Sequence, residues 1–148
     1  MLSARGKYGL KAMIHLAESQ EMGGVQGATI AEAQQIPKKF LDTILLELKN
    51  NGLVHSKKGK GGGYSLARPA AKISVGQIIR ILDGPLAAIA CASHSAYRAC
   101  SDCPDEAACQ IRRVMTLVRD ATAEILDNTS LATLIGPAAK RTFLNYDI

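Results

Sequence analysis

The sequence predicts a mainly α-helical fold with a small two-stranded β-ribbon and one long helix toward the C-terminus. An amphipathic helical pattern over residues 37–50 ends at a glycine. Two short extended runs then flank a basic, glycine-rich tip over residues 57–63. Apolar residues recur every three or four positions over residues 111–125, the pattern of a helix with one sustained apolar seam. With 148 residues, the chain is long enough for one domain with an apolar core.

Two helices are predicted before the amphipathic one. Ser3 can cap a first helix that runs to about Glu18. Thr29 and Glu32 have the spacing of a capping box, which predicts a short helix over residues 30–35. A tight turn then leads into the amphipathic helix, so the pair is expected to form a helix-turn-helix.

The amphipathic helix has one apolar and one polar face. Pro37 suits its first position because the fixed φ is helical and the missing N–H needs no partner there. Gly52 can adopt the left-handed conformation that ends a helix. The apolar face consists of Leu41, Ile44, Leu45 and Leu48. The opposite face begins with cationic or hydrogen-bonding side chains: Lys38, Lys39, Asp42 and Thr43.

A short β-ribbon is predicted after this helix, with strands at residues 55–56 and 64–66. Its tip is cationic, because Lys57, Lys58 and Lys60 lie between the strands. The consecutive glycines of the tip, Gly61, Gly62 and Gly63, let the backbone turn sharply and approach another surface closely.

A helix with a basic outer face followed by a basic ribbon predicts binding to double-stranded DNA. The helix can enter the major groove while the lysines and the backbone amides of Gly61 and Gly62 meet phosphates. Residues 1–80 carry 12 Lys and Arg against 5 Asp and Glu, whereas residues 81–148 carry 6 against 8. The basic half therefore coincides with the helix and ribbon. The alternative for the lysines alone is a solvated loop.

At these residues the chain resembles the Rrf2 family of bacterial winged helix-turn-helix regulators, which includes IscR, NsrR and RirA. The segment NGLVHSKKGKGGGYSLAR resembles the family's wing, and LSARGKYGLKAM resembles its first helix. The resemblance covers residues 1–88, weakens over the next loop and returns after Cys109. It implies a winged-helix DNA-binding domain followed by a dimerisation helix.

The second half of the chain is predicted to contain three further helices. Ser74 and Gln77 form a second capping box, and the helix that they begin ends at Gly84. A loop follows over residues 86–104, and a long helix is expected over 105–127. Thr129 can cap a last helix that ends at about Leu134, whereas residues 135–148 form a tail without usable signal.

The long helix predicts a homodimer. Its seam consists of Ile111, Val114, Val118, Ala121 and Ile125. Too little of the chain remains to cover this seam, so a second subunit is the expected partner. A dimer also fits the two-fold symmetry of many DNA operator sites.

Four cysteines lie between residues 91 and 109, and no other cysteine occurs in the chain. Clustered cysteines in a cytosolic protein indicate metal or redox chemistry rather than structural disulfides. Cys91, Cys100, Cys103 and Cys109 are therefore candidate ligands of a structural zinc ion or of an iron–sulfur cluster. Four unrelated thiols are the remaining alternative.

The family resemblance implies the iron–sulfur cluster. Sensor members carry three cysteines in the loop before the long helix and bind a [2Fe–2S] or [4Fe–4S] cluster with them. Some add a histidine where this chain has Arg112, and others an acidic residue where it has Tyr8. The additional Cys100 could replace that fourth ligand, which would give ligation by cysteine alone. The sequence does not indicate which cluster type is bound.

The expected organisation is a DNA-binding domain over 1–84, a cysteine-bearing sensor loop over 85–108, and a dimerisation helix with a short last helix over 109–134. The chain has no phosphate loop and no constellation of catalytic side chains, so neither an enzyme nor a small-molecule substrate is expected. It lacks an apolar signal segment and a run of the roughly 20 apolar residues that span a membrane, which predicts a cytoplasmic protein without a membrane partner.

Overall fold

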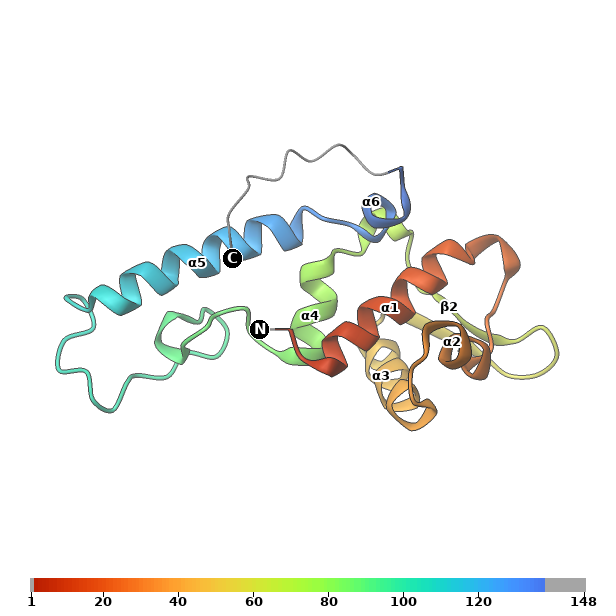
Figure 1. Ribbon diagram of the computed structural model, residues 1–148, viewed down its shortest axis with the longest axis horizontal. Helices are drawn as coiled ribbons and strands as arrows, with labels where there is room; N and C mark the ends of the chain where they lie inside the picture. The colour runs from red at the N-terminus through yellow and green to blue at the C-terminus, as the bar shows by residue number, and fades with distance from the viewer. Residues whose placement is uncertain (1, 138–148) are drawn as a thin grey trace.

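The computed structural model describes residues 2–137 as a mainly helical head from which one long helix extends (Figure 1). The elements are α1 (Ala4–Glu18), α2 (Gly27–Gln34), α3 (Lys38–Asn50), β1 (Val54–Lys57), β2 (Gly63–Leu66), α4 (Val75–Asp83), α5 (Gln110–Asp127) and α6 (Leu131–Ile135), with short 3-10 turns η1 (Gln20–Met22), η2 (Ala70–Lys72) and η3 (Ala90–Ala92). The two strands form one antiparallel sheet. The predicted fold class, helices with a two-stranded ribbon, is confirmed.

The predicted N-cap residues of α1 and α4, Ser3 and Ser74, are confirmed. The Ser3 hydroxyl accepts a hydrogen bond from the Gly6 N–H at 3.0 Å, and both bonds of the Ser74–Gln77 capping box form at 3.2 Å. Ser3 also donates its backbone N–H to the carboxylate of Asp83, at the end of α4. This hydrogen bond connects the N-terminus of α1 to the C-terminus of α4.

The prediction that Thr29 caps the second helix is wrong, because α2 begins at Gly27. Val25 pairs with Tyr64 of β2 through two backbone hydrogen bonds of 2.8 Å. This long-range pairing ends the extended segment at Gln26, so the helix starts two residues before the capping-box signal. Thr29 therefore lies within the first turn of α2.

Three predicted boundaries after residue 36 also shift. Pro37 precedes α3 as its N-cap, whereas Gly52 has the expected positive φ of 72°. The long helix begins at Gln110 rather than 105, because Asp105 accepts from the Ala107 N–H in a local turn of its own. The last helix is capped by Ser130, since the hydroxyl of Thr129 donates to a carbonyl of α5 instead.

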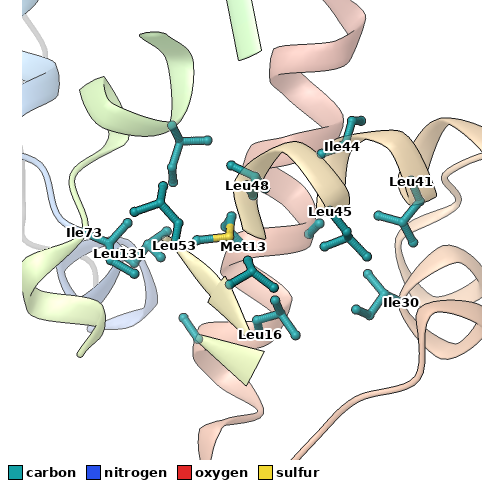
Figure 2. Close-up of a cluster of buried hydrophobic side chains, with 14 of the residues drawn as sticks. Met13, Leu16, Ile30, Leu41, Ile44, Leu45, Leu48, Leu53, Ile73 and Leu131 are labelled. Atoms are coloured by element: carbon teal, nitrogen blue, oxygen red, sulfur yellow. The ribbon is translucent and has the colours of Figure 1, made fainter. Parts of the chain in front are cut away.

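The apolar core lies between α1, α3, α4 and α6 (Figure 2). Leu131 of α6 is fully buried in this core beside Ile73, so the chain that follows the long helix returns to the head. Within residues 2–137, no helix is both long and apolar enough to cross a bilayer. The predicted tail of residues 135–148 lies almost entirely outside the described residues.

Replacing Leu45 by alanine should destabilise the protein strongly. Leu45 is fully buried on α3, so its removal leaves a cavity, and we expect a loss of about 2–5 kcal/mol in the free energy of unfolding. Chemical denaturation followed by circular dichroism measures this change. The matched control is Leu46→Ala on the next residue, which is exposed and should change stability by less than about 0.5 kcal/mol. Equal effects at both positions would contradict the packing of α3 described above.

Candidate functional site

The outer face of α3 is free of contacts with the core. Its apolar residues Leu41, Ile44, Leu45 and Leu48 are all buried, which points the opposite face away from the head. Four side chains predicted to contact a ligand are exposed there: Lys38, Lys39, Asp42 and Thr43. The structure thus presents the predicted polar face of α3 to solvent.

Two of these side chains form an ion pair, Lys38 with Asp42, one helical turn apart. The Thr43 hydroxyl donates to the carbonyl of Phe40 at 2.9 Å. Both interactions are local and exposed, so they contribute little to stability and are easily exchanged for contacts with a ligand. Lys39 makes no ion pair among the described residues.

The ribbon extends from the head with an exposed cationic tip (Figure 1). Its register pairs Val54 with Leu66 and Lys57 with Gly63. Lys58 and Lys60 lie on the connecting turn. Gly61 has a φ of 76°, which only glycine adopts without strain.

Gly62 differs from the other tip residues because it is buried. Its N–H donates to the carbonyl of Gly59, and its carbonyl accepts from the side chain of Gln26, both at 3.0 Å. The backbone groups of Gly62 are therefore used within the protein, whereas Gly61 remains exposed. Together with the pairing of Val25 and Tyr64, the Gln26 contact attaches the ribbon to the segment that leads into α2.

The four cysteines line a single cavity of about 460 Å³ between the loop and the first turn of α5. Cys91 lies on η3 and is 4% exposed, and Cys109 is the N-cap residue of α5. Apolar side chains form part of the wall: Ile89, Pro104, Ala108 and Ile111. Three acidic side chains line it as well: Asp102, Asp105 and Glu106.

Two thiols of this cavity, those of Cys100 and Cys103, have raised pKa values. The hydrogen bond between Cys100 and Cys91 raises the pKa of the Cys100 thiol, since it stabilises the protonated form. Partial burial raises the pKa of Cys103, and the charge of Cys109 and a hydrogen bond with it act in the same direction. All four cysteines are free thiols.

Two arginines of α5 hold the loop against the helix. Arg112 donates through Nε to the carbonyl of Cys91 at 2.9 Å, and Arg119 donates to the carbonyl of Ala92. The phenol of Tyr97 donates to the carboxylate of Glu106 at 2.8 Å, which raises the pKa of Tyr97. Cys91 is thus held in place by the helix that begins at Cys109.

No three Cys, His, Asp or Glu side chains of residues 2–137 are grouped closely enough to hold a single metal ion. His94, the one histidine on the cysteine-bearing loop, lines a different cavity of about 190 Å³ with Arg80 and Arg119. The thiols therefore share a cavity without converging on one point.

The helix α5 has no buried residue in the single chain. Leu117 is 66% exposed, and the seam residues Ile111, Val114, Val118 and Ile125 are about half exposed or more. The arginines that hold the loop lie on the opposite side of the helix, so most of this apolar stripe faces away from the loop, whereas Ile111 also lines the thiol cavity. The apolar periodicity of the sequence predicts this stripe but does not include Leu117 in it.

The far end of α5 is joined to α4 by a bidentate ion pair. Arg80 donates to both carboxylate oxygens of Asp127, at 2.6 and 2.8 Å. These hydrogen bonds lower the pKa of Asp127 and raise that of Arg80. Gly76 allows this approach, since a Cβ there would lie 2.0 Å from the Asp127 carboxylate.

Sequence reasoning missed the residues that hold these surfaces in place. Gln26, Arg112 and Arg119 each contact a backbone carbonyl far away in the chain. No local pattern marks such a partner. The seven-residue spacing of Arg112 and Arg119 does place them on one face of α5, opposite the apolar seam, but it does not identify the carbonyls that they contact.

Comparison with known proteins identifies the same family through a family model and through individual relatives. The family model described as Rrf2, iron-dependent transcriptional regulator, matches residues 2–137. A relative described as a putative HTH-type transcriptional regulator, rrf2-like, from Rhodobacter capsulatus is 40% identical over 146 residues, which is 95% of this chain and 97% of that protein.

Two solved structures resemble the chain closely. The global cysteine regulator CymR of B. subtilis has a TM-score of 0.75 at 34% identity, covering 90% of this chain and 95% of that one. IscR of T. potens has a TM-score of 0.72 at 32% identity, covering 91% of this chain and 85% of that one. The similarity includes both the head and the long helix, because coverage reaches nine-tenths of the chain.

Proposed function

This chain belongs to the Rrf2 family of DNA-binding transcriptional regulators, and from that premise we propose that it controls transcription in response to an iron–sulfur cluster on its cysteine loop. It is a regulator rather than an enzyme. One observation carries the proposal of a cluster: four thiols from a 19-residue segment line one cavity at the start of α5. The signal would be iron supply, redox state or nitric oxide.

The proposed DNA-binding surface combines α3 with the ribbon. The exposed start of α3 would enter the major groove, where Lys38 and Lys39 can donate to guanine or phosphate and Asp42 can accept from cytosine. Thr43 can pair with several bases. Lys57, Lys58 and Lys60 would contact phosphates together with the backbone of Gly61, while Gly62 shapes the tip from within.

Replacing Lys58 by alanine should weaken binding to all DNA sequences about equally. Each phosphate contact releases about one counterion, so the slope of log affinity against log salt should become shallower by about one. Fluorescence anisotropy with specific and scrambled duplexes over a salt series measures both quantities. Lys72→Ala is the matched control, because Lys72 lies on η2, which packs against α6 away from the ribbon. A changed base preference at unchanged slope would contradict the phosphate assignment.

Cys91, Cys100, Cys103 and Cys109 would hold the cluster, which supplies a redox-active, oxidant- and nitric-oxide-sensitive group when bound. The donor set fits, because four soft thiolate ligands share a cavity with apolar walls. Arg112 stands where some relatives carry a histidine, and its side chain is engaged with the backbone of Cys91. Cys100 is therefore the proposed fourth ligand.

The loop is suited to transmit its state to the DNA-binding surface. Arg112 and Arg119 connect the loop to α5, and the Arg80–Asp127 pair connects α5 to α4 in the head. Residues 1–84 would thus bind DNA, residues 85–108 sense, and residues 109–134 dimerise. A change of a few kcal/mol in the preferred arrangement shifts a two-state population substantially.

We further propose that α5 pairs with α5 of a second copy. An exposed apolar stripe of this length is unusual on a monomer and is the seam expected of a helical dimer. Two copies would present two reading surfaces to an operator with two half-sites. The cytoplasmic location expected from the sequence stays a prediction.

Anaerobic purification followed by iron, sulfide and zinc analysis tests the cluster proposal. Iron and acid-labile sulfide with absorption in the visible support the cluster. A colourless protein with one zinc per chain would instead establish the zinc-stabilised alternative. A protein with neither metal would indicate a regulator that responds through its thiols or through a protein partner, a class compatible with its similarity to a cysteine regulator.

A further inference from the structure

A cavity of about 190 Å³ lies where α4, the loop that follows it and α5 meet. Arg80 lines it from α4, His94 from the loop and Arg119 from α5. The cavity shares no lining residue with the thiol cavity. None of its side chains is a proposed DNA contact or cluster ligand, so the cavity has no role in the function proposed above.

The two arginines of this cavity are held in place but keep free hydrogen-bond donors. The bidentate pair with Asp127 uses two of the five N–H groups of Arg80. Asp127 itself lines a different cavity, so its carboxylate does not occupy this one. Arg119 is 13% exposed, donates to the carbonyl of Ala92 and pairs with Asp120. A guanidinium that is already fixed loses little conformational entropy when it binds a further anion.

The rest of the wall has a polar and an apolar part. Ser93 is 7% exposed, and its Oγ accepts from the Ala96 N–H at 3.0 Å, so its own O–H remains able to donate. His94 and Ser95 add two more polar side chains. The apolar part consists of Pro85, Leu86, Ala87 and Ala123.

These features define the chemistry of a ligand. The volume is below the roughly 300–1,000 Å³ of pockets that hold drug-sized molecules, so the ligand is small. The lining contains Arg80 and Arg119 against the single carboxylate of Asp120, which favours an anion. An inorganic anion would leave the apolar wall unused, and a neutral molecule would leave the arginine donors without a charged acceptor.

We propose that this cavity binds a small organic carboxylate with a short hydrocarbon chain. Its carboxylate accepts from Arg80, Arg119 and Ser93, and its chain lies against the apolar wall. Because guanidinium groups bind carboxylates with two parallel hydrogen bonds, the arginines supply both affinity and orientation. The lining side chains come from the head, the loop and α5, so one bound molecule contacts all three parts of the chain.

Butyrate is the probe, added to the whole chain without DNA or metal and followed by ligand-observed NMR. We expect saturable binding of one molecule per chain. Butyramide has the same shape without the charge, and inorganic phosphate has charge without the chain. Each should bind at least about 10-fold more weakly, since one loses the charge-assisted hydrogen bonds and the other the apolar contact. Absence of saturable butyrate binding would overturn the proposal, and equal binding of phosphate would overturn the assigned ligand class.

Two variants locate the binding. Ala123→Leu fills the cavity without removing a charge and should abolish butyrate binding, whereas Ala33→Leu, at an exposed position of α2, should not. Arg119→Gln should weaken binding at least about 10-fold. Arg113→Gln is its charge-matched control, because Arg113 is exposed on the same helix and does not line the cavity. Full binding by Ala123→Leu would overturn this location. DNA affinity and iron content are separate measurements, so either outcome leaves the proposed function standing.

Discussion

Replacing Leu117 by aspartate should convert the protein to a monomer and reduce its affinity for DNA on the order of 100-fold or more. Leu117 is the most exposed large apolar side chain of α5, and a carboxylate there would be buried without a partner in a helical dimer. The loss of affinity follows because each reading surface would bind its half-site alone. Sedimentation velocity and anisotropy with an operator-length duplex measure the two effects.

Two controls make this result interpretable. Leu117→Met conserves volume and polarity and should leave the dimer intact. Because α5 has no buried residue in a single chain, the head should keep its thermal unfolding transition in the aspartate variant. A dimeric Leu117→Asp protein with full affinity would show that this stripe is not the subunit interface.

Replacing Cys100 by alanine should abolish or strongly weaken the visible absorption of the reconstituted protein. Cys100 lines the same cavity as the other three cysteines, whereas His94 lines a separate one. The carboxylates of Asp102, Asp105 and Glu106 also line the thiol cavity, but they are harder donors than a thiolate and suit iron–sulfur chemistry less well. Iron and sulfide content should fall with the absorption. The measurement is an anaerobic titration with iron and sulfide followed by spectroscopy.

The neighbouring variant Ser101→Ala is the control, since Ser101 is exposed and does not line the thiol cavity. It should retain the full spectrum. An unchanged spectrum and metal content in Cys100→Ala would rule out ligation by four cysteines. Three-cysteine ligation, with a carboxylate of the cavity or an outside group as the fourth ligand, would then remain.

Much of the head could be predicted because its information is local. Apolar spacing identified the buried face of α3, and side-chain caps identified the starts of α1 and α4 at Ser3 and Ser74. The start of α2 was misplaced because a strand pairing between Val25 and Tyr64, distant in sequence, overrode the cap signal. Long-range pairing of this kind has no periodic signature.

The conformation of the cysteine loop could not be predicted from local sequence patterns. The sequence identified all four thiols, which line one cavity, but it did not predict the path of the loop that carries them, because residues 86–104 have no sustained period. The start of α5 was placed too early for a related reason. Cysteine is not a preferred capping residue, yet the sulfur of Cys109 accepts from the Arg112 N–H at 3.4 Å and begins the helix.

The attachment of the ribbon has a consequence for how DNA is recognised. The Val25–Tyr64 pairing and the bond from Gln26 to Gly62 attach the ribbon to the entry of α2, and α2 packs against α3. The ribbon is therefore held in a defined position relative to α3, the helix proposed to enter the major groove. Little conformational entropy is then lost when a duplex docks, because the spacing between phosphate-contacting and base-contacting groups is already set. Discrimination between operators should therefore come mainly from how easily each duplex deforms to match this fixed template.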